Sequence, residues 1–286
     1  MAELINGKLV SESIRKELRE EIAEFKKTSG IAPGLAVVVV GNDPAYAVYV
    51  RNKHKACLDV GIESYQIEYP EGISEEKLLA KIDELNADDR VSGILVQLPL
   101  PKEINEERVI ERISPDKDVD AFHPSNVGRI MIGNYSFLPC TPAGIISLLD
   151  YYSVEISGKR CAVIGRSNIV GKPMSLLLTE RNATVTLCHS KTRELEKICR
   201  EADIIVVAIG KAEFLKADMV KPGAVVVDVG INRNNEGKLV GDVAFEEVSR
   251  VASMITPVPG GVGPMTITTL LKNTLSAAKS QFLKRN

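Results

Sequence analysis

The sequence has few histidines and cysteines, no excess of charge of either sign and no long apolar run. Its 36 basic and 38 acidic residues leave a net charge of −2, whereas nucleic-acid-binding proteins usually carry a basic excess. No apolar run approaches the roughly 20 residues that cross a bilayer. We therefore expect a protein that binds no nucleic acid and enters no membrane.

The five cysteines are odd in number, widely separated and without a C-x-x-C pair, which argues against a disulfide framework and against a zinc site. His54, His123 and His189 lack metal-ligand spacing, and no G-x-S-x-G motif points to a nucleophilic hydrolase. Residues 1–8 contain an early acid and no apolar core of signal-peptide length. We expect a soluble cytoplasmic protein without a bound metal.

The composition, 44% hydrophobic and 26% charged, is that of an ordinary globular protein and excludes a disordered or fibrous one. The 286 residues are enough for about two domains. Leu35–Val40 is a continuous, mostly β-branched run, typical of a strand buried on both faces of a parallel sheet. Helical periodicity alternates with such strands along the chain, which predicts two α/β lobes with a mostly parallel sheet.

This alternation predicts the positions of the elements. Strands are expected at residues 35–40, 65–69, 93–98, 160–164, 184–187, 204–208, 224–229 and 254–256, and helices near 14–25, 45–60, 74–86, 105–113, 141–151, 170–180, 193–200 and 266–286. Thr141 and Pro142 are expected as the N-cap and first residue of their helix. We assign residues 1–138 to the first lobe and 139–265 to the second, with the terminal helix, 266–286, packing back on the first.

A glycine-containing segment follows the strand at 160–164 and precedes a helix. Backbone amides and a helix N-terminus at such a junction can face a pyrophosphate. The second glycine of the G-x-G-x-x-G fingerprint is Ser167 here, between Gly165 and Gly171, so the spacing alone leaves a plain strand-to-helix turn open.

The end of the next strand bears on which dinucleotide is bound. NAD-binding lobes usually place an acid about 20 residues beyond the glycine loop to hold the ribose hydroxyls. Leu187–Thr192 contains no acid, whereas Arg166, Ser190 and Lys191 are able to hold a 2′-phosphate. The sequence favours NADP over NAD, with solvated surface charge as the alternative for the two basic residues.

The first lobe offers three candidate features. Tyr49 and Lys53 lie four residues apart on one helical face, where partial burial would lower the pKa of the amine toward the range of proton transfer; a solvated helix face is the alternative. Gln97 lies at the end of an apolar strand, where α/β folds place groups that contact a ligand. A hydrogen-bonded amide in the core is an equally expected interpretation. The acidic run Asp116–Asp120 is either a solvated loop or a segment with a carboxylate that binds the edge of an aminopyrimidine ring. It lacks the residue pattern of a calcium-binding loop.

Eight segments, taken together and in this order, resemble the bifunctional methylenetetrahydrofolate dehydrogenase/methenyltetrahydrofolate cyclohydrolase family. They are Tyr49-x-x-x-Lys53, Gly93–Pro101, Lys117–Asp120, Pro139–Pro142, Gly165–Pro173, Cys188–Thr192, Val227–Asn232 and Pro257–Thr266. The last is dense in proline and glycine, which fixes its shape and lets backbone approach a flat ligand.

The resemblance implies a role for particular positions. It makes Lys53 the catalytic acid/base, Gln97 its hydrogen-bonding partner, Tyr49 the residue that stacks on the folate, and Asp120 the anchor of the pterin ring. The implied substrate-binding residues are Tyr49, Lys53, Gln97, Leu98, Pro99, Asp120, Pro259, Gly260 and Gly261, and the implied dinucleotide contacts are Gly165, Arg166, Ser167, Ser190 and Ile231.

The resemblance also implies a Rossmann-like NADP-binding second lobe, a homodimer formed through it, and oxidation of 5,10-methylenetetrahydrofolate followed by hydrolysis to 10-formyltetrahydrofolate. Many family members carry serine where this chain has Tyr46, which bears on the balance of the two activities. A dehydrogenase without the hydrolytic step, and a non-catalytic folate or dinucleotide sensor, are the alternatives.

Overall fold

The computed structural model describes residues 1–41, 44–234 and 236–285, with the backbone but not the side chains of residues 44–48. The chain divides into two compact units. The three-stranded unit contains Ser13–Cys140 and Ile267–Asn286, and the six-stranded unit contains Met1–Glu12 and Thr141–Thr266. The side chain of Tyr46, on which the sequence departs from the family pattern, lies outside the described residues.

The three-stranded unit is built on a parallel sheet in the order β3 (Glu63–Tyr69), β2 (Gly34–Val40) and β4 (Gly93–Val96). All seven residues of β2 are buried, as its unbroken apolar run predicts for a central strand. In β3, which lies at the edge of the sheet, exposed and half-buried residues alternate from Tyr65 to Tyr69, because successive side chains point to opposite faces.

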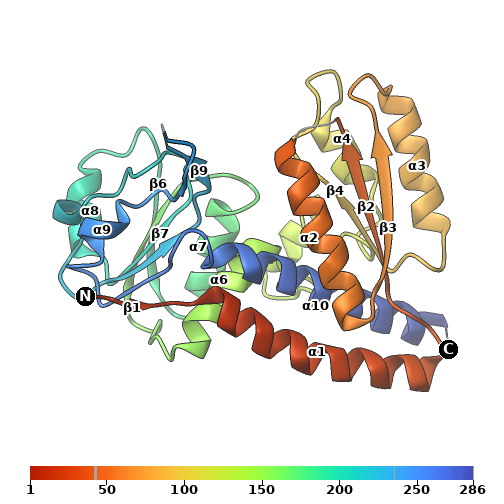
Figure 1. The fold of residues 1–286 in the computed structure, drawn as a ribbon, viewed down its shortest axis with the longest axis horizontal. Helices are drawn as coiled ribbons and strands as arrows, with labels where there is room; N and C mark the ends of the chain where they lie inside the picture. The colour runs from red at the N-terminus through yellow and green to blue at the C-terminus, as the bar shows by residue number, and fades with distance from the viewer. Residues whose placement is uncertain (42–43, 235, 286) are drawn as a thin grey trace. The chain divides into compact units, whose positions relative to one another are not determined.

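Helices cover both faces of this sheet (Figure 1). They are α2 (Pro44–Val60), α3 (Glu75–Ala87) and α4 (Glu106–Arg112), and α5 (Pro124–Met131) follows in the same unit. The side chains of Ser74 and Asn105 accept hydrogen bonds from the third residues of α3 and α4, so each of these polar residues caps the start of its helix. Helix α5 is absent from the sequence prediction because it contains Pro124, Ser125, Asn126 and Gly128, residues that favour turns.

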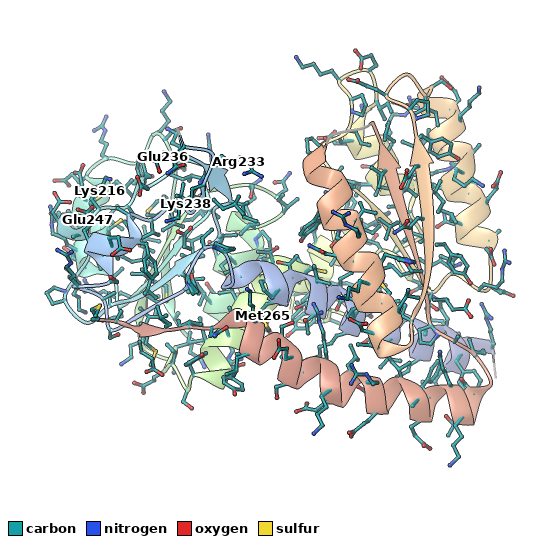
Figure 2. All side chains as sticks on the ribbon, viewed as in Figure 1. Lys216, Arg233, Glu236, Lys238, Glu247 and Met265 are labelled. Carbon is teal, nitrogen blue, oxygen red and sulfur yellow. The ribbon has the colours of Figure 1, made fainter. Side chains whose placement is uncertain are left out.

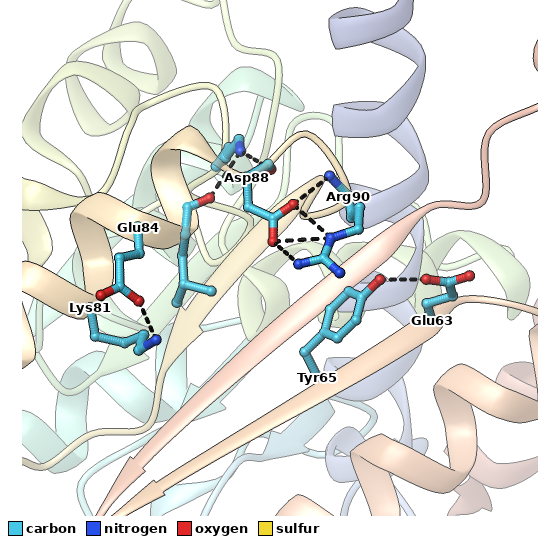
Figure 3. Close-up of polar contacts among 8 residues, drawn as sticks. Glu63, Tyr65, Lys81, Glu84, Asp88 and Arg90 are labelled. Carbon is cyan, nitrogen blue, oxygen red and sulfur yellow. Dashed lines mark hydrogen bonds and ion pairs between the residues drawn. The ribbon is translucent and has the colours of Figure 1, made fainter.

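The C-terminal end of α3 is held by a buried ammonium group. Lys117 Nζ donates to the carbonyl oxygens of Leu85 and Asp88 at 3.0 and 2.8 Å, which are among the groups a helix end leaves without partners. Figure 3 shows the Asp88 carboxylate paired in turn with Arg90. Two more pairs in that view, Tyr65–Glu63 and Lys81–Glu84, are solvent-exposed and add little stability.

The six-stranded unit has a parallel sheet in the order β1-β11-β8-β7-β5-β6. Its strands are β1 (Glu3–Leu4), β5 (Arg160–Ile164), β6 (Thr184–Cys188), β7 (Ile204–Val207), β8 (Val225–Asp228) and β11 (Met254–Ile255). Helices α7 (Gly171–Glu180), α8 (Leu195–Glu201) and α9 (Phe245–Val248), with the turn η1 (Ala217–Met219), cover it, and a hairpin of β9 (Asn232–Arg233) and β10 (Leu239–Val240) follows β8. This is the doubly wound arrangement predicted for the second lobe.

The sequence pattern predicts residues 1–12 in the first lobe, whereas the structure groups them with the six-stranded unit. Glu3 and Leu4 pair with Met254 and Ile255, a contact between two-residue strands that no local pattern reveals. Helix α1 (Gly7–Ser29) then carries the chain into the other unit. Its predicted apolar face is buried at Leu18, Ile22 and Phe25.

The helix at residues 140–151 and the C-terminal helix begin before the residues predicted for them. Helix α6 (Cys140–Tyr151) starts at Cys140, so Thr141 lies inside it, and the Thr141 hydroxyl is 3.0 Å from that of Thr266 instead of capping the helix. Helix α10 (Val262–Arg285) starts within the proline- and glycine-rich segment. Its Met265, labelled in Figure 2, lies against α6 so closely that a Cβ on Gly144 would be 2.9 Å from the Met265 Cβ.

The later part of α10 packs on the three-stranded unit, as predicted. Gln281 Nε2 donates to the carbonyl oxygen of Ser92 at 2.8 Å, and the ring of Phe282 lies edge-on to that of Phe25. Within the described ranges, no helix is long and apolar enough to span a bilayer.

Candidate active site and dinucleotide site

Lys53 is the buried amine of the three-stranded unit. Its side chain, on α2, is only 4% exposed, and its Nζ donates to Gln97 Oε1 at 3.0 Å. The same nitrogen lies 4.5 Å from the centre of the Tyr49 ring, one helical turn earlier, within the range of a cation–π contact. The structure therefore brings together the three residues that the sequence singled out, and the solvated-face alternative for Lys53 is wrong.

Gln97 is held so that its carbonyl oxygen faces the amine. It follows β4, its backbone N–H donates to Val38 O, and its side-chain amide Nε2 donates to Leu98 O at 2.9 Å. With the Nε2 group engaged by the backbone, Oε1 is the atom that accepts from Lys53. Leu98 is half-buried and Pro99 exposed at the carboxyl end of β4.

Asp120 and Cys140 complete the polar surroundings of Lys53. Burial raises the pKa of Asp120, and the Lys53 charge and a hydrogen bond from the Cys140 thiol oppose that rise. Burial also lowers the pKa of Lys53, against the attraction of the Asp120 carboxylate. Lys53 is thus an ammonium group that loses its proton more readily than an ordinary lysine, beside a carboxylate that balances its charge.

The acidic run around Asp120 is not a shared ligand cluster, because its members face different partners. Asp116 pairs with Lys284 at 2.6 Å on the surface. Asp118 is buried and accepts from the His123 N–H and from Asn126 Nδ2, both at 2.8 Å. Among the described residues, no group of three or more His, Cys, Asp or Glu side chains is arranged to hold a metal ion.

A residue that the sequence did not suggest fixes the backbone on either side of Asp120 and Cys140. Asn273, on α10, is buried, and its Nδ2 donates to Val119 O at 2.8 Å and to Leu138 O at 2.9 Å. One amide therefore joins two segments that carry polar residues next to Lys53. Its separation from Val119 by 154 residues explains why no sequence spacing indicates it.

Asn273→Ala is expected to lower the free energy of unfolding by about 2 to 3 kcal/mol, because Leu138 O and Val119 O lose the amide donor and only the weak Cys140 thiol donor to Val119 O remains. Urea denaturation measures this change. Ser276→Ala, an exposed position on the same helix, is the matched control and is expected to change the free energy by less than about 0.5 kcal/mol. Equal stability of the Asn273 variant and the control would contradict the bridging role.

The glycine segment after β5 packs tightly in the six-stranded unit. Gly165 has a φ of +126°, and a Cβ there would lie 2.2 Å from Ala208 O. A Cβ on Gly171 would lie 1.9 Å from Gly165 O, so only glycine lets α7 start this close to the end of β5. Ser167 Oγ accepts from the N–H groups of Val170 and Gly171 at 3.2 and 3.4 Å.

The other predicted dinucleotide contacts lie at the carboxyl ends of the parallel strands, the edge where such folds bind ligands. Arg166 and Ser167 follow β5, Ser190 follows β6, and all three are exposed. Ile231 follows β8 and is 65% exposed, unusual for a large aliphatic side chain. Basic and hydroxyl donors thus occur together with an apolar side chain, the set of groups that a phosphorylated dinucleotide needs.

Pro259, Gly260 and Gly261 belong to the six-stranded unit, whereas Lys53 belongs to the other. Their segment is fixed locally: Gly260 O accepts from the Lys8 N–H at 3.2 Å, and a Cβ on Gly7 would lie 1.7 Å from Gly261 O. Their role toward a folate stays a prediction from the family resemblance.

Comparison with known families matches both units. Residues 5–120 match the family described as tetrahydrofolate dehydrogenase/cyclohydrolase, catalytic domain, and residues 139–282 match its NAD(P)-binding domain. A relative from Acetivibrio thermocellus, named bifunctional protein FolD, is 60% identical over 280 residues, which cover 98% of each chain.

Comparison with solved structures indicates the same family. The bifunctional FolD methylenetetrahydrofolate dehydrogenase/cyclohydrolase of Campylobacter jejuni superposes with a TM-score of 0.96 at 51% identity, over 98% of this chain and 100% of that one. The Trypanosoma brucei FolD enzyme, crystallised with NADP and an inhibitor, gives a TM-score of 0.94 at 39% identity, over 98% of both chains.

Proposed function

The chain belongs to the tetrahydrofolate dehydrogenase/cyclohydrolase family, and on that premise we propose that Lys53 moves the protons of its hydrolytic step. The protein is a bifunctional enzyme. It oxidises 5,10-methylenetetrahydrofolate with NADP to 5,10-methenyltetrahydrofolate and hydrolyses this product to 10-formyltetrahydrofolate. The observation that carries the assignment to Lys53 is its burial with Nζ at 3.0 Å from Gln97 Oε1.

The six-stranded unit offers a donor set that suits NADP. When bound, this cofactor supplies the acceptor for the hydride of the substrate's methylene group. The backbone and side chain of Ser167 and the start of α7 suit a pyrophosphate, and Arg166 and Ser190 suit a 2′-phosphate. No acid occupies positions 187–192, at the end of β6 and just beyond it, where it would repel that phosphate.

The hydrolytic step requires proton transfers that a buried amine performs well. Water adds to the methenyl cation and loses a proton as the C–O bond forms. The bond from that carbon to the ring nitrogen then breaks as the nitrogen gains a proton and the new hydroxyl loses one to become the formyl C=O, so one proton is released to solvent overall. Lys53 in its neutral form accepts the first proton and then donates to the nitrogen. The lowered pKa of Lys53 raises the fraction of neutral amine, and Gln97 keeps Nζ in one place.

Three other groups orient the substrate in this proposal. Tyr49 presents its ring beside Lys53 for stacking on the pterin. The Asp120 carboxylate accepts from the N–H groups of the pterin's aminopyrimidine edge, a charge-assisted pairing. Leu98 and Pro99, with Pro259, Gly260 and Gly261, complete the predicted substrate contacts.

We also propose a homodimer formed through the six-stranded units and a location in the cytoplasm. The proposal of a dimer rests on the family resemblance. The five cysteines support a reducing compartment, because all are free thiols and all are buried.

A steady-state assay with methylenetetrahydrofolate and each nicotinamide cofactor tests the function. We expect reduction of NADP, appearance of the methenyl chromophore and its conversion to 10-formyltetrahydrofolate. Accumulation of the methenyl compound without further conversion would indicate a dehydrogenase that lacks the hydrolytic step. Binding of either ligand without turnover would indicate a sensor.

A further inference from the structure

Asp242 is a fully buried carboxylate in the six-stranded unit with no assigned role. Its oxygens accept from three consecutive backbone amides after β7, those of Ile209, Gly210 and Lys211, at 2.7, 3.0 and 2.8 Å. A fourth donor is Asn232 Nδ2, on β9, at 2.9 Å. One side chain therefore ties the segment after β7 to the segment after β8.

Asp228, the last residue of β8, holds the backbone of Asp242 in place. Its carboxylate accepts from the backbone N–H groups of Asp242 at 2.8 Å, Val243 at 3.0 Å and Gly230 at 2.9 Å. Burial raises the pKa of Asp228 to about 6, against these three amide donors. The three hydrogen bonds fix the backbone of Gly230, Asp242 and Val243 around this carboxylate.

The two carboxylates lie directly on glycine backbone. A Cβ on Gly230 would be 2.3 Å from Asp242 Oδ1, and a Cβ on Gly241 would be 1.8 Å from Asp228 Oδ2. Neither position accepts a larger residue without moving an aspartate. The arrangement therefore has one geometry, set by the glycines and the carboxylates together.

This network of hydrogen bonds fixes the residues on both sides of Ile231. Gly230 on one side is held by Asp228, and Asn232 on the other is held by Asp242, while Ile231 itself remains 65% exposed. Asn232 opens the β9–β10 hairpin, whose Arg233, Glu236 and Lys238 are labelled in Figure 2. An exposed isoleucine on an immobilised backbone is suited to pack against a flat ligand without losing conformational freedom on binding.

The network is also continuous with the glycine segment. Ala208, next to the amides held by Asp242, is the residue whose carbonyl would clash with a Cβ on Gly165. The segments after β5, β7 and β8 all leave the same edge of a parallel sheet, where this fold binds its ligand. Asp242 thus fixes two of the loops at the ligand edge, those after β7 and β8.

We propose that Asp242 is a positioning residue for the nicotinamide dinucleotide, acting through the backbone of Ile209–Lys211 and through Ile231, with Asp228 as its support. The inference rests on the proposed function of this unit. Asp242 does not contact the cofactor, because its carboxylate is covered by its four donors. Asp242 keeps these loops ordered before the cofactor binds.

Asp242→Asn tests this role, because the amide keeps the shape of the side chain but loses part of its capacity to accept. The Kd for NADP, measured by titration calorimetry of the full chain, is expected to rise about 10-fold or more as loop order is lost. The cyclohydrolase rate with methenyltetrahydrofolate is expected to stay within about 2-fold of wild type, since that step uses no dinucleotide and Lys53 lies in the other unit. A merely structural role would lower both.

Asp203→Asn is the matched control. The Asp203 carboxylate also accepts a hydrogen bond from a backbone N–H group, that of Arg160 at 2.9 Å. Asp203 precedes β7, however, and therefore lies at the opposite edge of the same sheet. Its Kd for NADP is expected to be unchanged. Asn232→Ala, which keeps both aspartates, is a second test if Asp242→Asn does not fold, with an expected rise in Kd of about 3-fold.

Two outcomes would overturn the inference: wild-type NADP affinity in both Asp242→Asn and Asn232→Ala, or an equal loss of NADP binding and cyclohydrolase rate. Absence of both activities from the wild-type protein would instead overturn the proposed function, so the two failures are distinguishable.

Discussion

Replacement of Lys53 by methionine is expected to lower the cyclohydrolase rate by at least about 100-fold, the lower end of what a positioned acid–base group contributes. Methionine fills a similar volume but can neither take a proton from water nor donate one to the ring nitrogen. The assay is hydrolysis of methenyltetrahydrofolate, followed by loss of its absorbance. Binding of NADP, measured separately, is expected to persist because the dinucleotide residues belong to the other unit.

Loss of the fold is not expected to explain this result. Burial lowers the pKa of Lys53 below its ordinary 10.5, so between the two pKa values the unfolded chain binds more protons and stability rises with pH. Methionine removes the buried charge and this pH dependence together. Methionine also leaves Gln97 Oε1 without its donor and the Asp120 carboxylate without its counter-charge, which opposes this gain. Retained NADP binding, and not the thermal midpoint, therefore shows that Lys53→Met is folded.

Lys55→Met is the matched control for this variant. Lys55 lies on the same helix, two residues further along, with its side chain exposed. It makes the same chemical change without touching Gln97 or Asp120, and a rate within about 2-fold of wild type is expected. Unchanged hydrolysis in Lys53→Met would refute the assignment of the proton-transferring group.

Replacement of Arg166 by alanine is expected to weaken NADP about 10- to 100-fold, the effect of losing a charge-assisted hydrogen bond to a phosphate. NAD has no 2′-phosphate, so its affinity is expected to change by less than about 3-fold. Arg166 follows Gly165 at the end of β5 and is exposed, which leaves its guanidinium available to a ligand. Calorimetric titration with each dinucleotide measures the difference.

Arg250→Ala controls for the loss of a positive charge from the same unit. Arg250 is exposed but precedes β11, at the opposite edge of the parallel sheet from Arg166. Neither dinucleotide is expected to bind more weakly to this variant. Equal losses of NAD and NADP affinity in Arg166→Ala would show that Arg166 does not contact the 2′-phosphate.

Much of the fold follows from local patterns. The β-branched run of β2 and the apolar strand β5 are specified by residues adjacent in sequence, and their predicted positions agree with the structure. The pair Lys53 and Gln97 was also accessible, because an amine on a helix face and a polar residue ending a buried strand are both visible as exceptions to an apolar pattern.

What the sequence did not reveal depends on contacts between distant residues. Asn273 lies 154 residues from the Val119 carbonyl that it holds, and a lone asparagine on an apolar helix carries no signal. Asp242 lies in an ordinary stretch of sequence and becomes informative only when three amides are seen to converge on it. The pairing of β1 with β11 involves two residues on each side, too few for any periodicity.

Proton transfer in the hydrolytic step depends most on the protonation state of the Lys53 amine. NMR titration of the lysine side chains measures this state directly, with the Lys53 signal identified by its absence from Lys53→Met. A pKa below the ordinary 10.5 is predicted for Lys53, because its burial outweighs the attraction of Asp120. A pKa at or above 10.5 would mean that the amine stays charged throughout the working range, and it would contradict proton transfer by this residue.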